Sequence, residues 1–177
     1  LEGIDYARRS ENLEEMLELW VVLGRAYMDG QKWDDAEFAF KRALSIKGAK
    51  GHKYIIAYAC AGRLYTILKR WDSAIFHLQK ALSIAEKHNY IELLVRSLQY
   101  LGDYYKEKNE LDSALLYYQR LLVIAKKYNL KKQEYITLFR LADCWLGKDE
   151  EKFQMAIMEM FKVQKSIASE GDMKILT

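Results

Sequence analysis

The chain has 177 residues, of which 51% are apolar and 30% are charged, a balance typical of a globular rather than a disordered protein. The 28 basic and 25 acidic residues are interspersed and give a formal net charge of +3, which favours neither nucleic acid nor an anionic membrane as a partner. The longest charge-free run, Tyr54 to Gly62, is far shorter than the ~20 residues of a membrane-spanning helix. Cys60 and Cys144 each fall in an apolar stretch, as expected for buried thiols of a cytoplasmic protein.

Apolar residues at spacings of three and four predict eight helices in four antiparallel hairpins, and the absence of proline favours short turns between them. In chain order the helices are expected at 12–28, 33–47, 53–68, 72–88, 91–107, 111–128, 132–146 and 151–169. Residues 1–10 are predicted as the end of a helix from a preceding repeat, because Ile4 and Ala7 precede Gly24 as similar residues precede Gly102. We therefore expect the chain to be part of a longer protein.

Two signatures recur in these hairpins. Gly24, Gly62 and Gly102 lie at intervals of 38 and 40 residues in the first helices, and Ala142 takes this place in the fourth copy. The second helices of the first three copies are expected to open with an apolar residue, aspartate, a polar residue and alanine, where the aspartate would accept hydrogen bonds from first-turn N–H groups. Residues 153–156 are a degenerate fourth example without the aspartate. The predicted units are repeats at 11–48, 52–89, 90–129 and, in degenerate form, 131–169, followed by a C-terminal segment at 170–177.

The first copy resembles the tetratricopeptide repeat in both of its helices. The matching residues are Trp20, Leu23, Gly24, Tyr27, Ala36, Phe40 and Ala43. The resemblance implies an all-α fold, a right-handed superhelix (α-solenoid) of antiparallel helical hairpins, with a concave groove that binds another polypeptide. The copies are about four to six residues longer than the usual ~34, and in this they resemble the arrays of bacterial peptide-pheromone receptors, kinesin light chains and polarity adaptors.

The first helices of such an array line the groove, so its contacts are expected on their positions outside the signature. The candidate groove residues are Val21, Arg25, Met28, Arg63, Thr66, Arg96, Gln99, Asp103, Lys106, Phe139 and Asp143. Arg25 and Arg63 could form a fork for a carboxylate, joined by Arg96. Ion pairs between these arginines and neighbouring acidic residues, with no ligand, are the alternative.

Nothing in the sequence predicts catalysis, a cofactor or a metal site. His52, His77 and His88 lack metal-ligand spacing, and the glycine-containing stretch 48–53 is predicted as a connector because it lacks P-loop spacing. The lysines near residues 126–132 are expected to form a solvated turn rather than a nucleic-acid contact.

We therefore expect a non-enzymatic scaffold whose partner is another protein or a peptide segment. The second hypothesis is a regulatory peptide-sensing domain of a bacterial transcription regulator or signalling switch. Self-association through incomplete repeat ends, around Leu1, Ile4 and the segment 167–176, is a further expectation.

Overall fold

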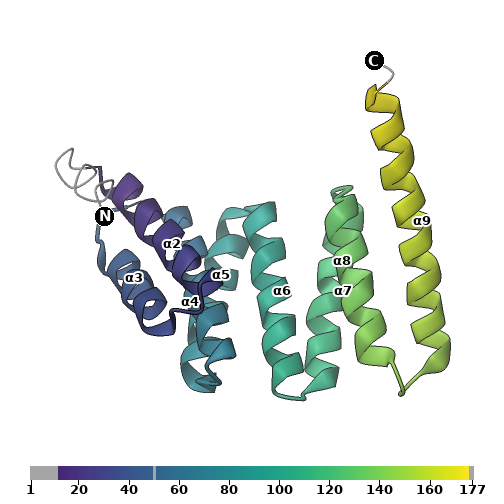
Figure 1. Cartoon of the computed structure of the whole chain (residues 1–177), viewed down its shortest axis with the longest axis horizontal. Coiled ribbons are helices and arrows are strands. Elements are labelled where there is room, and N and C mark those ends of the chain that lie inside the picture. The colour runs from purple at the N-terminus through teal and green to yellow at the C-terminus, as the bar shows by residue number, and fades with distance from the viewer. Residues whose placement is uncertain (1–11, 50, 176–177) are drawn as a thin grey trace. The chain divides into compact units, whose positions relative to one another are not determined.

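The described part of the chain consists of helices and short turns. The computed structural model describes residues 12–49 and 51–175, with side chains described as far as residue 169. The helices are α2 (Leu13–Asp29), α3 (Trp33–Ser45), α4 (Gly51–Ile67), α5 (Trp71–His88), α6 (Ile91–Glu107), α7 (Leu111–Lys127), α8 (Lys131–Trp145) and α9 (Glu150–Ile175) (Figure 1). Their ends agree with the predicted ones within two residues, except that α9 continues to Ile175. The predicted helix end at 1–10 lies outside the described residues.

The helices form two compact units, divided between Tyr104 and Tyr105 within α6. In the first unit α2 packs on α3 and α4 packs on α5, and α4 also contacts both helices of the first hairpin. In the second unit α8 packs on α7 and on α9. The all-α class of paired helices is confirmed, whereas the division of the chain into repeats stays a prediction. No helix in the described part has the length and apolar character that spanning a membrane requires.

In each hairpin of the first unit, a large side chain of the second helix packs against a glycine of the first helix. Phe40 and Leu78 are 1% and 0% exposed, and they face Gly24 and Gly62. A Cβ atom on Gly62 would lie 2.6 Å from Leu78 Cγ and 3.1 Å from the Leu78 backbone nitrogen, which is too close for either to remain in place. The glycines therefore allow the two helices of a hairpin to approach closely, as the repeat signature predicts.

Replacing Gly62 by alanine should destabilise the first unit by about 1–3 kcal/mol, because the new methyl group overpacks the contact with Leu78. Gly30→Ala is the matched control, since a Cβ there would lie 3.5 Å from the Ala26 carbonyl oxygen, an ordinary van der Waals contact. Urea unfolding followed by circular dichroism measures both. Equal loss in the two variants would show that the close approach at Gly62 is not what matters.

Five of the helices, α2, α4, α5, α6 and α7, end in turns of one kind, with a residue in the left-handed conformation one or two positions after the helix. Positive φ angles of 53–60° occur at non-glycine residues in five turns, at Gln31, Lys69, Asn89, Asn109 and Asn129. In the second hairpin the Lys69 N–H donates to the Thr66 carbonyl and the Arg70 N–H donates to the Tyr65 carbonyl, as in a Schellman motif. Hydrogen bonding of the backbone therefore closes these turns without glycine at the left-handed position.

A left-handed residue other than glycine stores strain, and Lys69→Gly should release it. We expect a gain in stability of about 0.5–1 kcal/mol, because the left-handed penalty of a side chain exceeds the chain-entropy cost of glycine. Lys87→Gly, within the last turn of α5, is the control and should lose about 1 kcal/mol. Thermal unfolding of both variants tests the sign, and a loss at Lys69 would contradict the strain argument.

The predicted aspartate caps are wrong for three second helices. The N-cap residues of α3, α5 and α7 are Lys32, Arg70 and Glu110, and none of them caps the helix with its side chain. The aspartates instead lie in the first helical turn, where their charge is favourable to the helix dipole. The reason is that the preceding Schellman turn leads the chain directly into the helix, two residues earlier than a capping aspartate would require.

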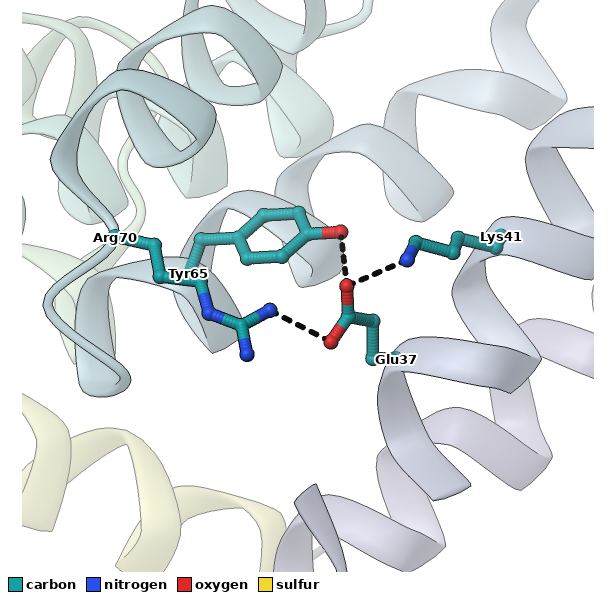
Figure 2. Close-up of polar contacts among 4 residues, drawn as sticks. All are labelled: Glu37, Lys41, Tyr65 and Arg70. Carbon is teal, nitrogen blue, oxygen red and sulfur yellow. Dashed lines mark hydrogen bonds and ion pairs between the residues drawn. The ribbon is translucent and has the colours of Figure 1, made fainter. Parts of the chain in front are cut away.

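An ionic cluster around Glu37 joins the first hairpin to the second (Figure 2). The Glu37 carboxylate, on α3, accepts hydrogen bonds from Tyr65 Oη at 3.2 Å and Arg70 Nη1 at 2.8 Å, and Lys41 Nζ lies 2.7 Å away. Burial by itself would raise the pKa of the Glu37 carboxyl, but the bonds from Lys41, Arg70 and Tyr65 outweigh it and hold the pKa below its ordinary value. Burial and the adjacent carboxylate raise the pKa of Tyr65 to about 12. Near pH 7 the Glu37 carboxylate is therefore ionised, whereas the Tyr65 hydroxyl is protonated and neutral.

Glu37→Gln should cost about 1 kcal/mol near pH 7, a modest value because Lys41 and Arg70 are more than half exposed to solvent. A lowered folded-state pKa stabilises the protein above the unfolded-state pKa, and this stabilisation is lost as the pH falls through the folded-state value. The difference between variant and parent should therefore shrink toward about pH 3.

Urea unfolding at the two pH values measures this difference. Glu159→Gln, which removes an ion pair with Lys126 that is exposed on both sides, is the control and should stay within about 0.5 kcal/mol. An undiminished difference at low pH would mean that Glu37 acts through packing rather than charge.

Candidate functional site

Three arginines from successive first helices converge on one surface of the first unit. Arg25 lies on α2, Arg63 at the equivalent position of α4, and Arg96 on α6. Each of the first two directly follows the glycine that faces the second helix of its hairpin. Because neighbouring residues on a helix point about 100° apart, burial of the glycine directs the arginine away from its own hairpin.

The three arginines line a pocket of about 160 Å³, which we call the arginine pocket. Its lining residues are Arg25, Met28, Asp29, Cys60, Arg63, Arg96 and Tyr100. All belong to the first unit, and they come from α2, α4 and α6. The pocket is thus built by the helices that the repeat pattern assigns to a groove.

The charge of the arginine pocket is not neutralised from within. Among the described residues, none of the three arginines forms an ion pair, and Asp29 supplies the single negative charge in the lining. Arg63 lies over the ring of Tyr100, with 5.5 Å between its guanidinium carbon and the ring centroid. This cation–π contact orients the guanidinium without satisfying its hydrogen-bond donors. The arginines therefore remain available for an anionic group.

Cys60 contributes a buried thiol to the same lining. Its side chain is 3% exposed, and burial raises the pKa of the thiol in spite of the opposing charges of Arg25, Arg96 and Arg63. The thiol is consequently protonated at neutral pH. It adds no negative charge to the pocket and lacks the thiolate that a nucleophilic cysteine needs.

Four of the sequence-predicted groove residues meet in this pocket: Arg25, Met28, Arg63 and Arg96. Val21 and Thr66 are instead buried, at 4% and 7% exposure, and do not line the pocket. The Thr66 hydroxyl donates to the Gly62 carbonyl within α4. These two side chains are buried because the inward-facing side of each first helix is wider than the positions of the recurring glycines alone suggest.

The remaining predicted residues lie apart from the pocket. Gln99 and Asp103 are half-buried on α6 and do not line it. In the second unit Lys106 forms an ion pair with Asp143, which satisfies both charges. Phe139 on α8 is 57% exposed. The structure therefore brings the three predicted arginines together, but neither Lys106 nor the predicted acidic residues join them.

The sequence argument missed Asp29, Cys60 and Tyr100. A signal for them existed, because Asp29 lies four residues after Arg25 and Cys60 lies three residues before Arg63, on the same helical stripes. Tyr100 occupies on α6 the repeat position that Cys60 occupies on α4. Including the residues one helical turn before and after each arginine would have identified all three.

The other chemical candidates lie in structural surroundings. His77 is half-buried among aromatic rings, with the centroid of Tyr65 at 5.1 Å and that of Phe76 at 5.3 Å. In the stretch 48–53, Gly48 has a φ of 97° and Lys53, within α4, pairs with Glu18. No group of three or more histidine, cysteine or acidic side chains in the described part of the chain could hold a metal ion.

Comparisons with known proteins agree with this architecture. Residues 17–50 match the model of the tetratricopeptide repeat family. No curated protein has a sequence that matches the chain.

Several solved structures share its fold. BtubC (BKLC) from P. vanneervenii has a TM-score of 0.79 and 16% identity, covering 93% of this chain and 70% of its own. Aspartyl phosphate phosphatase F from Bacillus subtilis has a TM-score of 0.81 and 18% identity, covering 89% of this chain but 42% of its own. A kinesin light chain from Podospora anserina with nearly identical TPR-like repeats has a TM-score of 0.73 and 15% identity, covering 94% and 84%.

At these identities the likenesses show the fold alone, an all-α array of the α-solenoid class. Residues 17–50 match the tetratricopeptide repeat family, and the fold of the chain is similar to that of solved structures with TPR-like repeats.

Proposed function

We propose that the chain is a non-enzymatic scaffold that binds an anionic segment of another polypeptide in the arginine pocket. Tetratricopeptide-type arrays are in general protein-interaction scaffolds, and this supports the class of function. The observation that supports this surface is the convergence of Arg25, Arg63 and Arg96, from three helices, without an acidic partner among the described residues.

The physical reason is the cost of holding like charges together. Three guanidinium groups at one pocket repel one another, and nothing in the fold of the first unit requires them there, because their side chains do not close its core. An incoming carboxylate or other anion relieves this repulsion and receives charge-assisted hydrogen bonds from more than one arginine. Binding energy is thus available in the complex that the free chain lacks.

A second candidate is a peptide-sensing regulatory domain of a bacterial switch. The fold similarity to aspartyl phosphate phosphatase F from Bacillus subtilis favours it, since that is a bacterial phosphatase of which this chain spans 42%. The same pocket would serve in either case. The gene that encodes the full-length protein separates the two, because an effector domain beside the repeats would favour the switch and further repeats alone would favour the adaptor.

Peptide libraries with one fixed central residue test the proposed surface. The chain should bind more peptide from libraries with a fixed aspartate or glutamate than from libraries with a fixed alanine or lysine. Arg25→Glu combined with Arg63→Glu should abolish this preference, because the reversed charges repel the residue that they formerly attracted. Arg120→Glu, an exposed arginine of α7 in the second unit, makes the same type of charge change outside the pocket and should keep the preference.

Stability separates binding from folding in this test. Arg63→Glu should leave the free energy of unfolding within about 0.5 kcal/mol, as expected for an exposed residue. Unfolding of the variant would show that the arginine is structural. An unchanged preference for acidic libraries in a folded double variant would place the binding surface elsewhere.

A further inference from the structure

The arginine pocket has more positive charge than one carboxylate can neutralise. Its lining holds three guanidinium groups and one carboxylate, that of Asp29, which leaves an excess of two positive charges. A carboxylate brings one negative charge, whereas a phosphoryl group on a side chain brings about −1.5 to −2 at neutral pH. By charge, a phosphorylated residue is the better match.

The arrangement of donors points in the same direction. The three arginines approach from three different helices, and each presents a planar fork of N–H donors. A carboxylate has two oxygens in one plane, whereas a phosphoryl group has three terminal oxygens in a pyramid that donors from three directions can reach. The Arg63 guanidinium is already oriented by the ring of Tyr100, which reduces the entropy lost on binding.

The size and surroundings of the pocket indicate the kind of molecule that bears the phosphoryl group. A volume of about 160 Å³ holds a phosphoryl group, but it is below the roughly 300–1,000 Å³ typical of pockets for whole small-molecule ligands. Val22, one turn before Arg25, is 60% exposed, and Ile67, one turn after Arg63, is 44% exposed. These apolar neighbours suit apolar side chains of a peptide, and they interrupt the track of positive charge that a nucleic-acid backbone requires.

From this geometry, and resting on the proposed peptide-binding function, we propose that the arginine pocket recognises a phosphorylated serine or threonine with apolar neighbours in a partner polypeptide. Arg25, Arg63 and Arg96 hold the phosphoryl oxygens. Val22 and Ile67 contact the residues that flank the phosphorylated one. Binding of the partner would then depend on its state of phosphorylation.

Fluorescence anisotropy with three blocked peptides tests the proposal, using the whole chain. The peptides have the common sequence acetyl-Ala-Leu-X-Leu-Ala-amide, in which X is phosphoserine, glutamate or serine, and each is labelled with the same dye. The phosphoserine peptide should bind at least about tenfold more tightly than the glutamate peptide, and the serine peptide should not bind measurably. Arg63→Glu should abolish binding of the phosphoserine peptide, and Arg120→Glu should leave it unchanged.

Two further variants keep the test informative. Arg63→Lys keeps the positive charge but removes the planar fork of N–H donors. It should weaken binding of the phosphoserine peptide several-fold, and it can be measured even if Arg63→Glu proves unstable. Val22→Ser should weaken binding of the phosphoserine peptide. It should leave the affinity of the arginine pocket for inorganic phosphate, measured by competition, unchanged, because Val22 is predicted to contact the flanking residue only.

Each other outcome overturns the proposal in a distinct way. Equal binding of the glutamate and phosphoserine peptides, both dependent on Arg63, would leave the anionic-peptide scaffold in place and remove the phosphate preference. Inorganic phosphate that binds as tightly as the phosphoserine peptide would indicate a site for a small anion. A preference for an otherwise identical peptide with a free C-terminus would assign the pocket to a terminal carboxylate. If no peptide binds, the phosphate proposal fails, and the acidic libraries decide independently whether the scaffold proposal stands.

Discussion

The close approach of two helices at a glycine is the contact on which the rest of the first unit depends. Phe40 and Leu78 occupy the space that a side chain on Gly24 or Gly62 would need, so that each hairpin has one well-defined packing. Contacts of this kind are sensitive to a single methylene group, because protein interiors are packed as densely as organic crystals. Once the glycine faces inward, the orientation of every other residue on that helix is determined by the helical period.

This constraint explains why the arginine pocket lies where it does. Arg25 and Arg63 follow their glycines directly, and the contact between α2 and α4 brings them to one surface. Arg96 joins them from α6, although it does not occupy the same repeat position. The pocket therefore combines two arginines at the same repeat position, on α2 and α4, with one at a different position on α6.

Arg70 and the arginines of the arginine pocket differ in how their charge is balanced. Arg70 pairs with a carboxylate that is also bonded to Tyr65 and Lys41, and the cluster joins adjacent hairpins. Those of the arginine pocket have no such partner among the described residues. An arginine whose charge is satisfied within the fold contributes to stability, whereas unpaired arginines gathered in a pocket keep their hydrogen-bond donors available to an anion. The comparison within one chain supports the distinction between structure and function that the sequence left open.

Much of the fold could be predicted from the sequence, because it rests on local patterns. The spacing of apolar residues located the helices, and the recurrence of Gly24, Gly62 and Gly102 indicated their pairing. The turns were less predictable, since non-glycine residues such as Lys69 adopt the left-handed conformation under the demands of the backbone hydrogen bonds. That is also why aspartate capping, inferred from residue type alone, was wrong.

By itself, the sequence determined the helical hairpins and the presence of basic residues on the first helices, because periodicity and residue type are local properties. Only the tertiary structure decided which of these residues share a pocket and which lie in the core. Val21 and Arg25 are one turn apart, yet the first is buried by a neighbouring helix and the second lines the pocket. The pairing of Asp143 with Lys106, and the position of Tyr100 beneath Arg63, were likewise decided by contacts between helices distant in the chain. Such contacts depend on how helices cross, which no single repeat encodes.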